Sequence, residues 1–455
     1  MTELKKNMII PVEIEGYTSE GYGVAKPNGH VVFIKGALQG EICQIKILKA
    51  GKNVSYGKIE SIIHPSPHRV EPSCPSFGKC GGCSLLHMDY NEELGYKKQV
   101  VENALLRIGK TDIPVSAIHG SSDTEFYRNK VIYNIQKDKS GKIIYGFYRQ
   151  RSHDVIPGKD CVIGFREADC ICQTVTSLME KFRIPAYDPI TRTGLIRHVF
   201  VRRGMNTKEI QVGIVSKEQN IPEIDYLMQS ICSSCDNVKS IILNVNKSTG
   251  NTVLAGEFYT VFGNDYISDI LCGLKFDLSL RSFFQINPKQ AENLYNKAIE
   301  YADLTGKETV LDLYCGTGTI TLCLAKHAKN VIGAEIVPEA IENAKENAVK
   351  NSITNAEFYC ADASQIAANL LADGLKPDVI TVDPPRKGLS ADVIKSVSEM
   401  SPERVVYISC DPGTLSRDIN IFSSFGYQPV KVECFDMFPR CSHIETVALL
   451  SKLKI

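Results

Sequence analysis

From about residue 290 onward, the chain alternates short apolar runs with longer amphipathic stretches. The apolar runs are TVLDLY, VIGAEI, AEFYC, PDVITVD and RVVYIS, and the stretches between them include PKQAENLYNKAIEYADL and PEAIENAKENAVKNS. Short buried strands that alternate with helices form mostly parallel sheets with helices on both faces. The pattern therefore predicts a doubly wound α/β domain in the C-terminal part of the chain.

Two other regions precede this one. Residues 1–64 alternate short β-rich runs with glycine-containing turns, a pattern typical of a small five-stranded barrel. Four prolines in HPSPHRVEPSCP then interrupt regular structure and indicate a linker. Strands and turns mix between residues 125 and 275, where KVIYNIQKDKSGKIIYGFYRQ predicts a β-hairpin. At 455 residues the chain exceeds the usual domain length, so several hydrophobic cores are expected.

Polar residues at the ends of the predicted parallel strands indicate a nucleoside site. Gly316 and Gly318 directly follow a strand, where they permit a tight turn and close ligand approach. Glu335 ends the next strand, where its carboxylate can accept hydrogen bonds from both ribose hydroxyls, and Asp383 ends a third. A dinucleotide site would need a third glycine, whereas adenosylmethionine carries no phosphate. A glycine turn without any ligand is the alternative.

Cys410 and Glu445 are candidates for covalent chemistry. Cys410 follows the strand RVVYIS at the carboxyl edge of the predicted sheet, where ligand chemistry usually lies, although most cysteines are ordinary core residues. A thiolate can add to carbon 6 of uracil and make carbon 5 nucleophilic, after which a base must remove the carbon 5 proton. Glu445 is the candidate base, His443 is its competitor, and a surface carboxylate is the alternative interpretation.

A cysteine cluster indicates a metal site. Cys74, Cys80 and Cys83 are spaced C-x5-C-x2-C, and the glycines between them let the backbone fold around a metal. The spacing leaves Cys161, Cys170 and Cys172 open as fourth ligand, and it leaves zinc and an iron-sulfur cluster equally open. Cys232 and Cys235 have no partner pair nearby, so no site is predicted there.

Six ordered motifs resemble the family of RNA uracil-5 methyltransferases of the RlmD, RlmC and TrmA type. They are RSFFQIN (281–287), DLYCGTGT (312–319), Glu335, DPPRKG (383–388), SCDP (409–412) and HIET (443–446). The N-terminal segment resembles the TRAM domain, an OB-like RNA-binding β-barrel. The resemblance implies an α/β Rossmann-like class I methyltransferase domain over 92–124 and 276–455, a TRAM barrel over 1–64, and a central α+β iron-sulfur domain over 65–91 and 125–275. It also implies that a helix at about 92–124 packs with the catalytic domain.

The resemblance also assigns roles to individual residues. It implies that Gln285, Tyr314, Glu335 and Asp383 bind S-adenosyl-L-methionine, that Cys410 is the nucleophile, and that Glu445 is the general base. Ribosomal members carry a [4Fe-4S] cluster with this cysteine spacing, which implies Cys74, Cys80, Cys83 and Cys161 as its ligands.

The expected partner is RNA, and 23S ribosomal RNA is the expected substrate, because transfer RNA enzymes of the family are expected to lack the barrel and the cluster. An amine methyltransferase would normally place an aromatic residue where Arg386 stands, and a non-catalytic RNA-binding assembly factor would not need Cys410. No run approaches membrane-spanning length, and a cytoplasmic monomer is expected. The 52 basic and 52 acidic residues cancel, so RNA contacts are expected only at local basic and aromatic runs. These runs hold Arg128, Lys130, Arg197, His198, Arg202 and Arg203.

Overall fold

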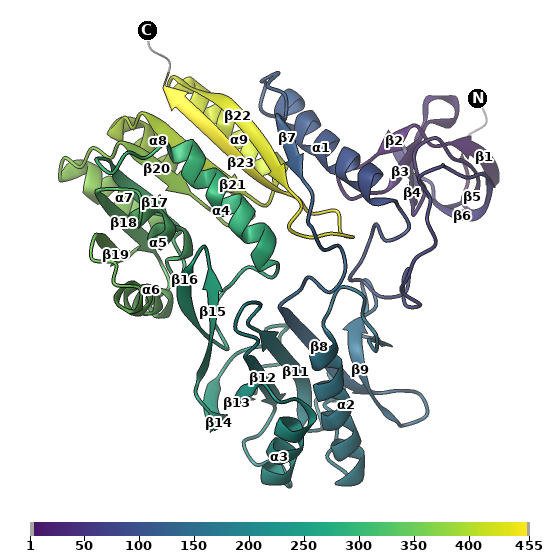
Figure 1. Cartoon of the computed structure of the whole chain (residues 1–455). Coiled ribbons are helices and arrows are strands. Elements are labelled where there is room, and N and C mark those ends of the chain that lie inside the picture. Colours follow the sequence, from purple (N-terminus) through teal and green to yellow (C-terminus); the bar gives the residue numbers. More distant parts are fainter. Residues whose placement is uncertain (1–3, 453–455) are drawn as a thin grey trace.

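A computed structural model describes residues 4–452, and its N-terminal part is a small β-barrel (Figure 1). The sheet order is β1-β5-β6-β4-β3-β2. Only two residues separate β1 from β2, and together they form one bent strand that pairs with β5 at one end and with β3 at the other. The five-stranded barrel is therefore confirmed. Its strands are β1 (Ile9–Glu13), β2 (Gly16–Tyr17), β3 (Gly23–Ala25), β4 (Val31–Lys35), β5 (Ile42–Lys49) and β6 (Val54–His64), with a short 3-10 turn, η1 (Pro27–Gly29), before β4.

The helix expected over residues 92–124 is shorter than predicted. Helix α1 (Tyr90–Arg107) begins at Asp89, whose carboxylate accepts the backbone N–H of Glu92, and it packs against α9. Pro114 lies just beyond the helix and cannot continue it, since proline has no N–H to donate. The chain then forms strand β7 (Ala117–His119), which pairs with the C-terminal strand β22. The prediction of helix beyond Arg107 is therefore wrong.

The central unit is a seven-stranded sheet covered on one face by two helices. The order is β10-β9-β8-β11-β12-β13-β14, and β8 and β9 form the predicted hairpin. A separate hairpin, β15 and β16, leads toward the C-terminal unit (Figure 1). The elements are β8 (Lys130–Lys137), β9 (Ile143–Tyr148), β10 (Val155–Pro157), α2 (Arg166–Lys181), β11 (Ile196–Arg203), β12 (Ile210–Ser216), α3 (Ile224–Ser234), β13 (Val238–Val245), β14 (Glu257–Gly263), β15 (Tyr266–Leu271) and β16 (Leu274–Ser279).

The C-terminal unit is an eight-stranded sheet with the order β19-β18-β17-β20-β21-β23-β22-β7, and β23 runs antiparallel to both its neighbours. One buried cluster lies between the sheet and helices α1, α7, α8 and α9, and a second lies between it and α4 and α5. The doubly wound fold is therefore confirmed. Its elements are α4 (Pro288–Ala302), β17 (Thr309–Leu313), α5 (Thr319–Ala325), β18 (Asn330–Glu335), α6 (Pro338–Lys350), β19 (Ala356–Cys360), α7 (Ala363–Ala372), β20 (Val379–Val382), α8 (Ala391–Met400), β21 (Arg404–Ser409), α9 (Pro412–Ser424), β22 (Tyr427–Phe435) and β23 (Glu445–Lys452).

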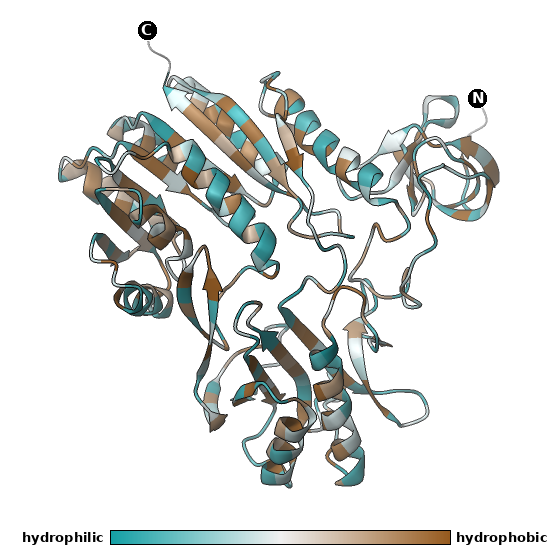
Figure 2. Ribbon diagram, in the orientation of Figure 1, coloured by the Kyte–Doolittle hydropathy of each residue, from teal (hydrophilic) through white to brown (hydrophobic). Residues whose placement is uncertain are grey.

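The strands of this sheet are more apolar than the helices around it. In Figure 2 brown residues concentrate on the inner strands, whereas the helices carry brown on one side and teal on the other. This is the distribution that burial of the sheet on both faces requires. None of the helices within residues 4–452 is both long enough and apolar enough to span a membrane.

The chain leaves the C-terminal unit for the central sheet and returns to it at neighbouring positions. The backbone N–H of Asn129, just before β8, donates to the carbonyl of Ile286, just before α4, at 2.9 Å. The Asn129 side-chain amide donates to the carbonyl of Gln285, also at 2.9 Å. The central unit is thus an insertion whose two ends lie side by side, next to a predicted donor-binding residue.

Candidate active site and cysteine cavity

The glycine turn after β17 and the end of β18 form one structure. Gly316 and Gly318 have positive φ angles of 56° and 80°, which other residues adopt only with strain. A Cβ atom at Gly318 would lie 3.0 Å from Ala344, so the close approach of α6 also requires glycine. The carboxylate of Glu335 accepts the backbone N–H groups of Gly316 at 3.3 Å and of Ile336 at 2.9 Å. These bonds fix the carboxylate at the turn, and its binding of the ribose hydroxyls stays a prediction.

Three other predicted donor-binding residues surround the same edge of the sheet. Tyr314 directly follows β17 and has a φ of 66°, a left-handed conformation that is uncommon outside glycine and often marks functional sites. Asp383 directly follows β20, and burial together with Asp312 raises its pKa to about 7. Gln285 lies just before α4, near the Tyr295 hydroxyl. The structure therefore brings all four predicted residues to the carboxyl edge of the parallel strands.

Cys410 and Glu445 come together through the pairing of β21 with β23. Ser409 pairs with Thr446 in this antiparallel ladder, so the next residues along the two strands are Cys410 and Glu445. Residues in opposed positions lie about 5 Å apart and point to the same face of the sheet. Glu445 is only 5% exposed, which rules out the alternative of a surface carboxylate.

The charges around this pair shift their pKa values. Burial and the neighbouring carboxylates of Glu445 and Asp383, opposed by Arg386, together raise the pKa of the Cys410 thiol to about 11. Burial and Asp383 raise the pKa of Glu445 well above its ordinary range. Perturbed groups that lie this close together are typical of active sites. The arrangement can move a proton between a thiol and carboxylates.

Arg386 and His443 lie at the exposed side of the pair. The guanidinium of Arg386 contacts Nε2 of His443 at 3.4 Å, and burial and Arg386 both lower the pKa of the imidazole. His443 keeps a large part of its surface exposed although its ring is partly covered, whereas Glu445 is buried beside Cys410. Glu445 is therefore better placed than His443 to act on a group bound against the thiol.

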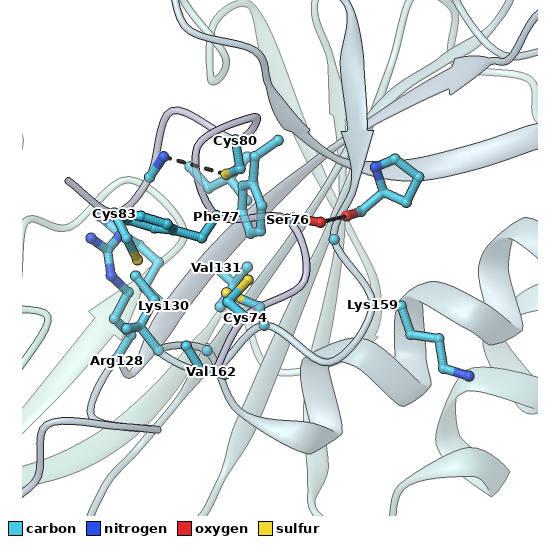
Figure 3. Close-up of a pocket in the computed structure, with 18 of the residues that line it drawn as sticks. Cys74, Ser76, Phe77, Cys80, Cys83, Arg128, Lys130, Val131, Lys159 and Val162 are labelled. Atoms are coloured by element: carbon cyan, nitrogen blue, oxygen red, sulfur yellow. Dashed lines mark hydrogen bonds between the residues drawn. The ribbon is translucent and has the colours of Figure 1, made fainter. Parts of the chain in front are cut away.

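The four predicted metal ligands line one cavity of about 250 Å³. Cys74, Cys80 and Cys83 come from the linker loop, and Cys161 comes from the segment after β10. Figure 3 shows the thiols of Cys74, Cys80 and Cys83 around a common space, with Arg128 beside Cys83. Cys170 and Cys172 lie on α2 and do not line the cavity. Within residues 4–452, no group of three or more His, Cys, Asp or Glu side chains is arranged to hold a metal ion.

Comparison with known proteins identifies the family. The family model described as tRNA (Uracil-5-)-methyltransferase matches residues 89–453, and the TRAM domain model matches residues 4–59. The chain belongs to this RNA uracil-5 methyltransferase family. It is an S-adenosylmethionine-dependent RNA methyltransferase with an N-terminal TRAM domain, as its motifs predicted.

Relatives of similar length support this membership. An uncharacterized RNA methyltransferase from Clostridium tetani is 43% identical over 448 residues, covering 98% of this chain and 97% of that protein. Another from Halalkalibacterium halodurans is 42% identical over 448 residues, covering 98% of both proteins. The similarity of this methyltransferase to them therefore extends through the barrel, the central unit and the catalytic unit.

A solved structure corrects one expectation about the family. The tRNA (uracil-54, C5)-methyltransferase of Pyrococcus abyssi, solved with S-adenosyl-L-homocysteine, is 26% identical, with a TM-score of 0.79. The match covers 97% of this chain and 99% of that chain, so it includes the barrel. The expectation that transfer RNA enzymes lack the barrel is wrong for the Pyrococcus abyssi enzyme. The barrel alone therefore does not identify the RNA substrate.

Most of the basic residues predicted to contact RNA are engaged inside the methyltransferase. Arg202 is 1% exposed and donates to the carbonyls of Ser279 and Ser282, so it ties β11 to the segment after β16. Arg197 donates to the carbonyls of Asn246 and Ser248. His198 is buried, Arg203 pairs with Glu167, and Arg128 and Lys130 line the cysteine cavity. The RNA contacts predicted for Arg197, His198 and Arg202 are therefore wrong.

Sequence reasoning missed Tyr295, which lies beside two of the predicted donor-binding residues. This tyrosine on α4 is 3% exposed, and its hydroxyl lies 3.3 Å from the Thr319 hydroxyl at the start of α5. The same hydroxyl lies near Gln285 and Asp383. In the sequence Tyr295 is one apolar position of an amphipathic helix, so no local signal distinguishes it from core residues.

Proposed function

We propose that this methyltransferase converts uridine in RNA to 5-methyluridine through a covalent adduct between Cys410 and carbon 6 of the base. The main support is the opposed position of Cys410 and Glu445 at the ends of β21 and β23. A thiol and a buried carboxylate there adjoin the edge that holds Gln285, Tyr314 and Glu335. A nucleophile and a base beside a donor site are the groups that this chemistry needs.

The reaction begins with formation of a bond between the Cys410 sulfur and carbon 6. The thiol gives its proton to a neighbouring carboxylate or to water, and its thiolate adds to the ring, leaving an enolate. Carbon 5 of the enolate then attacks the methyl carbon of adenosylmethionine, and the carbon–sulfur bond of the sulfonium breaks to release S-adenosylhomocysteine. Both electrons of that bond leave with the homocysteine sulfur.

Glu445 completes the reaction. Its carboxylate removes the proton from carbon 5, the ring double bond reforms, and the Cys410 thiolate departs from carbon 6. Burial and Asp383 raise the pKa of Glu445, which makes the ionised carboxylate a stronger base. Arg386 carries the positive charge that keeps ionised forms of Cys410 and Glu445 accessible.

The donor would be held by the groups gathered around the glycine turn. Glu335 keeps free lone pairs for the ribose hydroxyls, because the N–H groups it accepts use only part of its capacity. Asp383, Gln285 and Tyr314 would surround the methionine part of the donor. The donor also supplies a positive sulfonium, which favours ionisation of the nearby Cys410 thiol.

We also propose that the cysteine cavity would hold a [4Fe-4S] cluster. Its ligands would be Cys74, Cys80, Cys83 and Cys161. Zinc would hold four thiolates at about 2.3 Å, so they would lie roughly 4 Å apart. A cluster spreads its thiolates further, because each binds a different iron. The support for the cluster is that all four cysteines line one cavity, whose volume is about 250 Å³.

Arg128 strengthens this assignment. Its Nε is buried and, among the described residues, has no hydrogen-bond partner. A buried donor beside thiols can bond a cluster sulfur and offset the negative charge of four thiolates. A cluster held by these cysteines would supply structural order and a fixed charge to the loop.

We further propose that the barrel over 1–64 binds RNA, that 65–91 and 125–275 form the iron-sulfur unit, and that 92–124 and 276–455 carry out methyl transfer. The protein would act as a cytoplasmic monomer. The preferred substrate is 23S ribosomal RNA, which rests on the cysteine set that resembles ribosomal members. Transfer RNA is the second candidate, because the Pyrococcus abyssi enzyme matches the whole architecture.

The test is a methyl-transfer assay on defined RNAs. The purified protein is incubated with methyl-labelled adenosylmethionine and transcripts of 23S ribosomal RNA or transfer RNA, and the digested RNA is examined for 5-methyluridine. Labelled 5-methyluridine in the 23S transcript supports the full proposal. Label only in transfer RNA would overturn the substrate, and label in a different nucleoside would overturn the chemistry.

A further inference from the structure

The loop between β22 and β23 leads to Glu445, the proposed base. This loop is bonded to parts of the chain that are distant in sequence. This base loop, residues 436–444, contains His443 and ends at Glu445. It connects two strands of the sheet, yet its central backbone groups bond the linker loop and α1. The loop that leads to Glu445 is therefore bonded to segments more than 300 residues away in the sequence.

The first of these segments is the cysteine loop, residues 80–85. The carbonyl of Arg440 accepts the backbone N–H groups of Ser84 at 2.9 Å and of Leu85 at 3.0 Å. The thiol of Cys441 donates to the carbonyl of Gly82 at 3.1 Å. These three contacts flank Cys83, one of the proposed cluster ligands. The base loop is thus bonded directly to the backbone of the cysteine loop.

The second segment is α1 with its flanking residues. The backbone N–H of Arg440 donates to a carboxylate oxygen of Glu93 at 2.8 Å, and its guanidinium contacts the same carboxylate at 3.4 Å. The guanidinium also bonds the carbonyl of Met88 and the hydroxyl of Thr124, and it lies over the ring of Tyr90. Arg440 has a φ of 69°, a left-handed conformation that needs such support outside glycine.

Buried charges hold the beginning of the base loop. Lys97 is completely buried and donates to Glu93 at 2.7 Å and to Asp436 at 2.6 Å. Tyr127 donates its hydroxyl to the carbonyl of Pro439 at 3.1 Å. Nearer Glu445, the loop is held by the cysteine loop at Arg440 and Cys441 and by the contact of Arg386 with His443.

We propose that Arg440 is a positioning residue that couples the order of the cysteine loop to the placement of Glu445. This inference rests on the proposed function, in which Glu445 is the base and the four thiols hold a cluster. Gly81 and Gly82 give the cysteine loop high backbone freedom when nothing joins its thiols. A group bound by the thiols fixes the N–H groups of Ser84 and Leu85, and these in turn fix the carbonyl of Arg440.

The coupling predicts which step of the reaction fails when the base loop is displaced. Glu445 acts only after the methyl group has been transferred, so a displaced base should leave the methylated base attached to Cys410. Donor binding at the glycine turn and formation of the adduct should continue. A general loss of structure would instead reduce donor binding and adduct formation together.

The first test is Arg440→Ala in protein that contains iron and sulfide. The variant keeps the backbone carbonyl that accepts from Ser84 and Leu85, but it loses the guanidinium contacts that hold this residue in its left-handed conformation, so the carbonyl is no longer fixed. We expect unchanged donor affinity, accumulation of a covalent protein–RNA adduct on denaturing gels, and release of 5-methyluridine slowed about 10- to 100-fold. Arg404→Ala is the matched control, because Arg404 is also a partly buried arginine beside carboxylates but lies at the opposite end of β21. Product release at the wild-type rate from Arg440→Ala would overturn the proposal.

The second test does not depend on activity or on the folding of that variant. Amide hydrogen exchange is compared between the wild-type protein and Cys161→Ser, whose change lies outside both loops. We expect faster exchange in residues 80–88 and 436–446, with unchanged exchange in the barrel strands. Unchanged exchange in 436–446 despite loss of iron would overturn the coupling. Absence of 5-methyluridine from the wild-type reaction would instead overturn the proposed function, whatever the exchange result.

Discussion

The methyltransferase has two groups of thiols in contrasting surroundings. At the sheet edge, the thiol of Cys410 lies beside the carboxylates of Glu445 and Asp383, with Arg386 on the exposed side. In the cysteine cavity, four thiols lie with Arg128 and Lys130, and no Asp or Glu is among the described residues that line it. The same side-chain type therefore meets proton acceptors in one place and cations in the other.

The difference shows how neighbours decide what a thiol can do. Beside carboxylates, a proton released by a thiol or by a carbon atom has a nearby acceptor, and a bond to sulfur can form and break repeatedly. Beside cations, the negative charge of several thiolates is balanced, which favours lasting metal ligation. Four predictions test this contrast.

The largest effect is expected from removing the thiol at the sheet edge. Cys410→Ala should reduce 5-methyluridine formation at least about 10³-fold, because no other group can form the bond to carbon 6. Donor affinity, measured by calorimetry, should be unchanged. Cys360→Ala removes an exposed cysteine that also lies at the end of a parallel strand; it is the control and should retain activity. Full activity of Cys410→Ala would remove the covalent mechanism.

The next effect concerns the carboxylate beside that thiol. Glu445→Gln should trap the methylated RNA adduct and slow its release about 10²- to 10⁴-fold, because the carbon 5 proton then has no base. The adduct is measured by denaturing gel and mass spectrometry. Glu433→Gln removes a buried glutamate from the neighbouring strand β22, where it bonds His119, and should not trap an adduct. Normal turnover in Glu445→Gln would assign the proton to another group.

Removing one thiol from the cysteine cavity should affect methyl transfer less than the two changes above. It should clearly lower the iron and sulfide content of the protein. Cys161→Ser should lose most of the bound iron and sulfide, because one of four ligands is gone, while donor affinity stays unchanged. Metal analysis and visible absorption measure the loss. Cys170→Ser, on α2 outside the cavity, should retain the metal. Equal iron in Cys161→Ser and the wild type would show that the cavity is not the cluster site.

The smallest effect is a shift of the pH profile. Arg386 opposes the rise in the pKa of Cys410 and Glu445, so Arg386→Gln should raise both pKa values further. Less thiolate is then present at a given pH, and the alkaline rise of kcat/KM should move about 0.5–1 unit higher, with activity near neutral pH about 3- to 10-fold lower. Lys387→Gln, one residue away, should leave the profile in place. An unshifted profile in Arg386→Gln would show that Arg386 does not act on the thiol.

The sheet and its edge residues were predictable because the relevant signals are local. Each apolar run in the C-terminal part became a strand, and Glu335 and Cys410 lie at or just after strand ends because a strand boundary is encoded within a few residues. Once parallel strands are known, their carboxyl ends must meet at one edge. This rule brings Asp383 to the same place.

Features that depend on distant partners could not be predicted. Strand β7 has three residues, and only its pairing with β22 defines it. No local pattern therefore indicated a strand within the segment that was expected to be helical. Arg202 belongs to a basic and aromatic run that resembles an RNA-binding surface, but carbonyls about 80 residues away bury it. The bonds between Arg440 and the cysteine loop join segments with no sequence relation, so no pattern in either segment indicates them.

The paired backbone at Asn129 and Ile286 gives the catalytic unit a modular character. Because the chain departs and returns at one spot, a short turn could join these positions without moving β7 or α4. The strand order of the eight-stranded sheet takes no strand from the inserted segment, although the hairpin of β15 and β16 at its end adds Ile267 and Phe276 to the core beside α4. Exchange of the central sheet alone, with this hairpin kept, would therefore leave the catalytic unit intact. Recognition of a new RNA could be acquired there while the chemistry stayed the same.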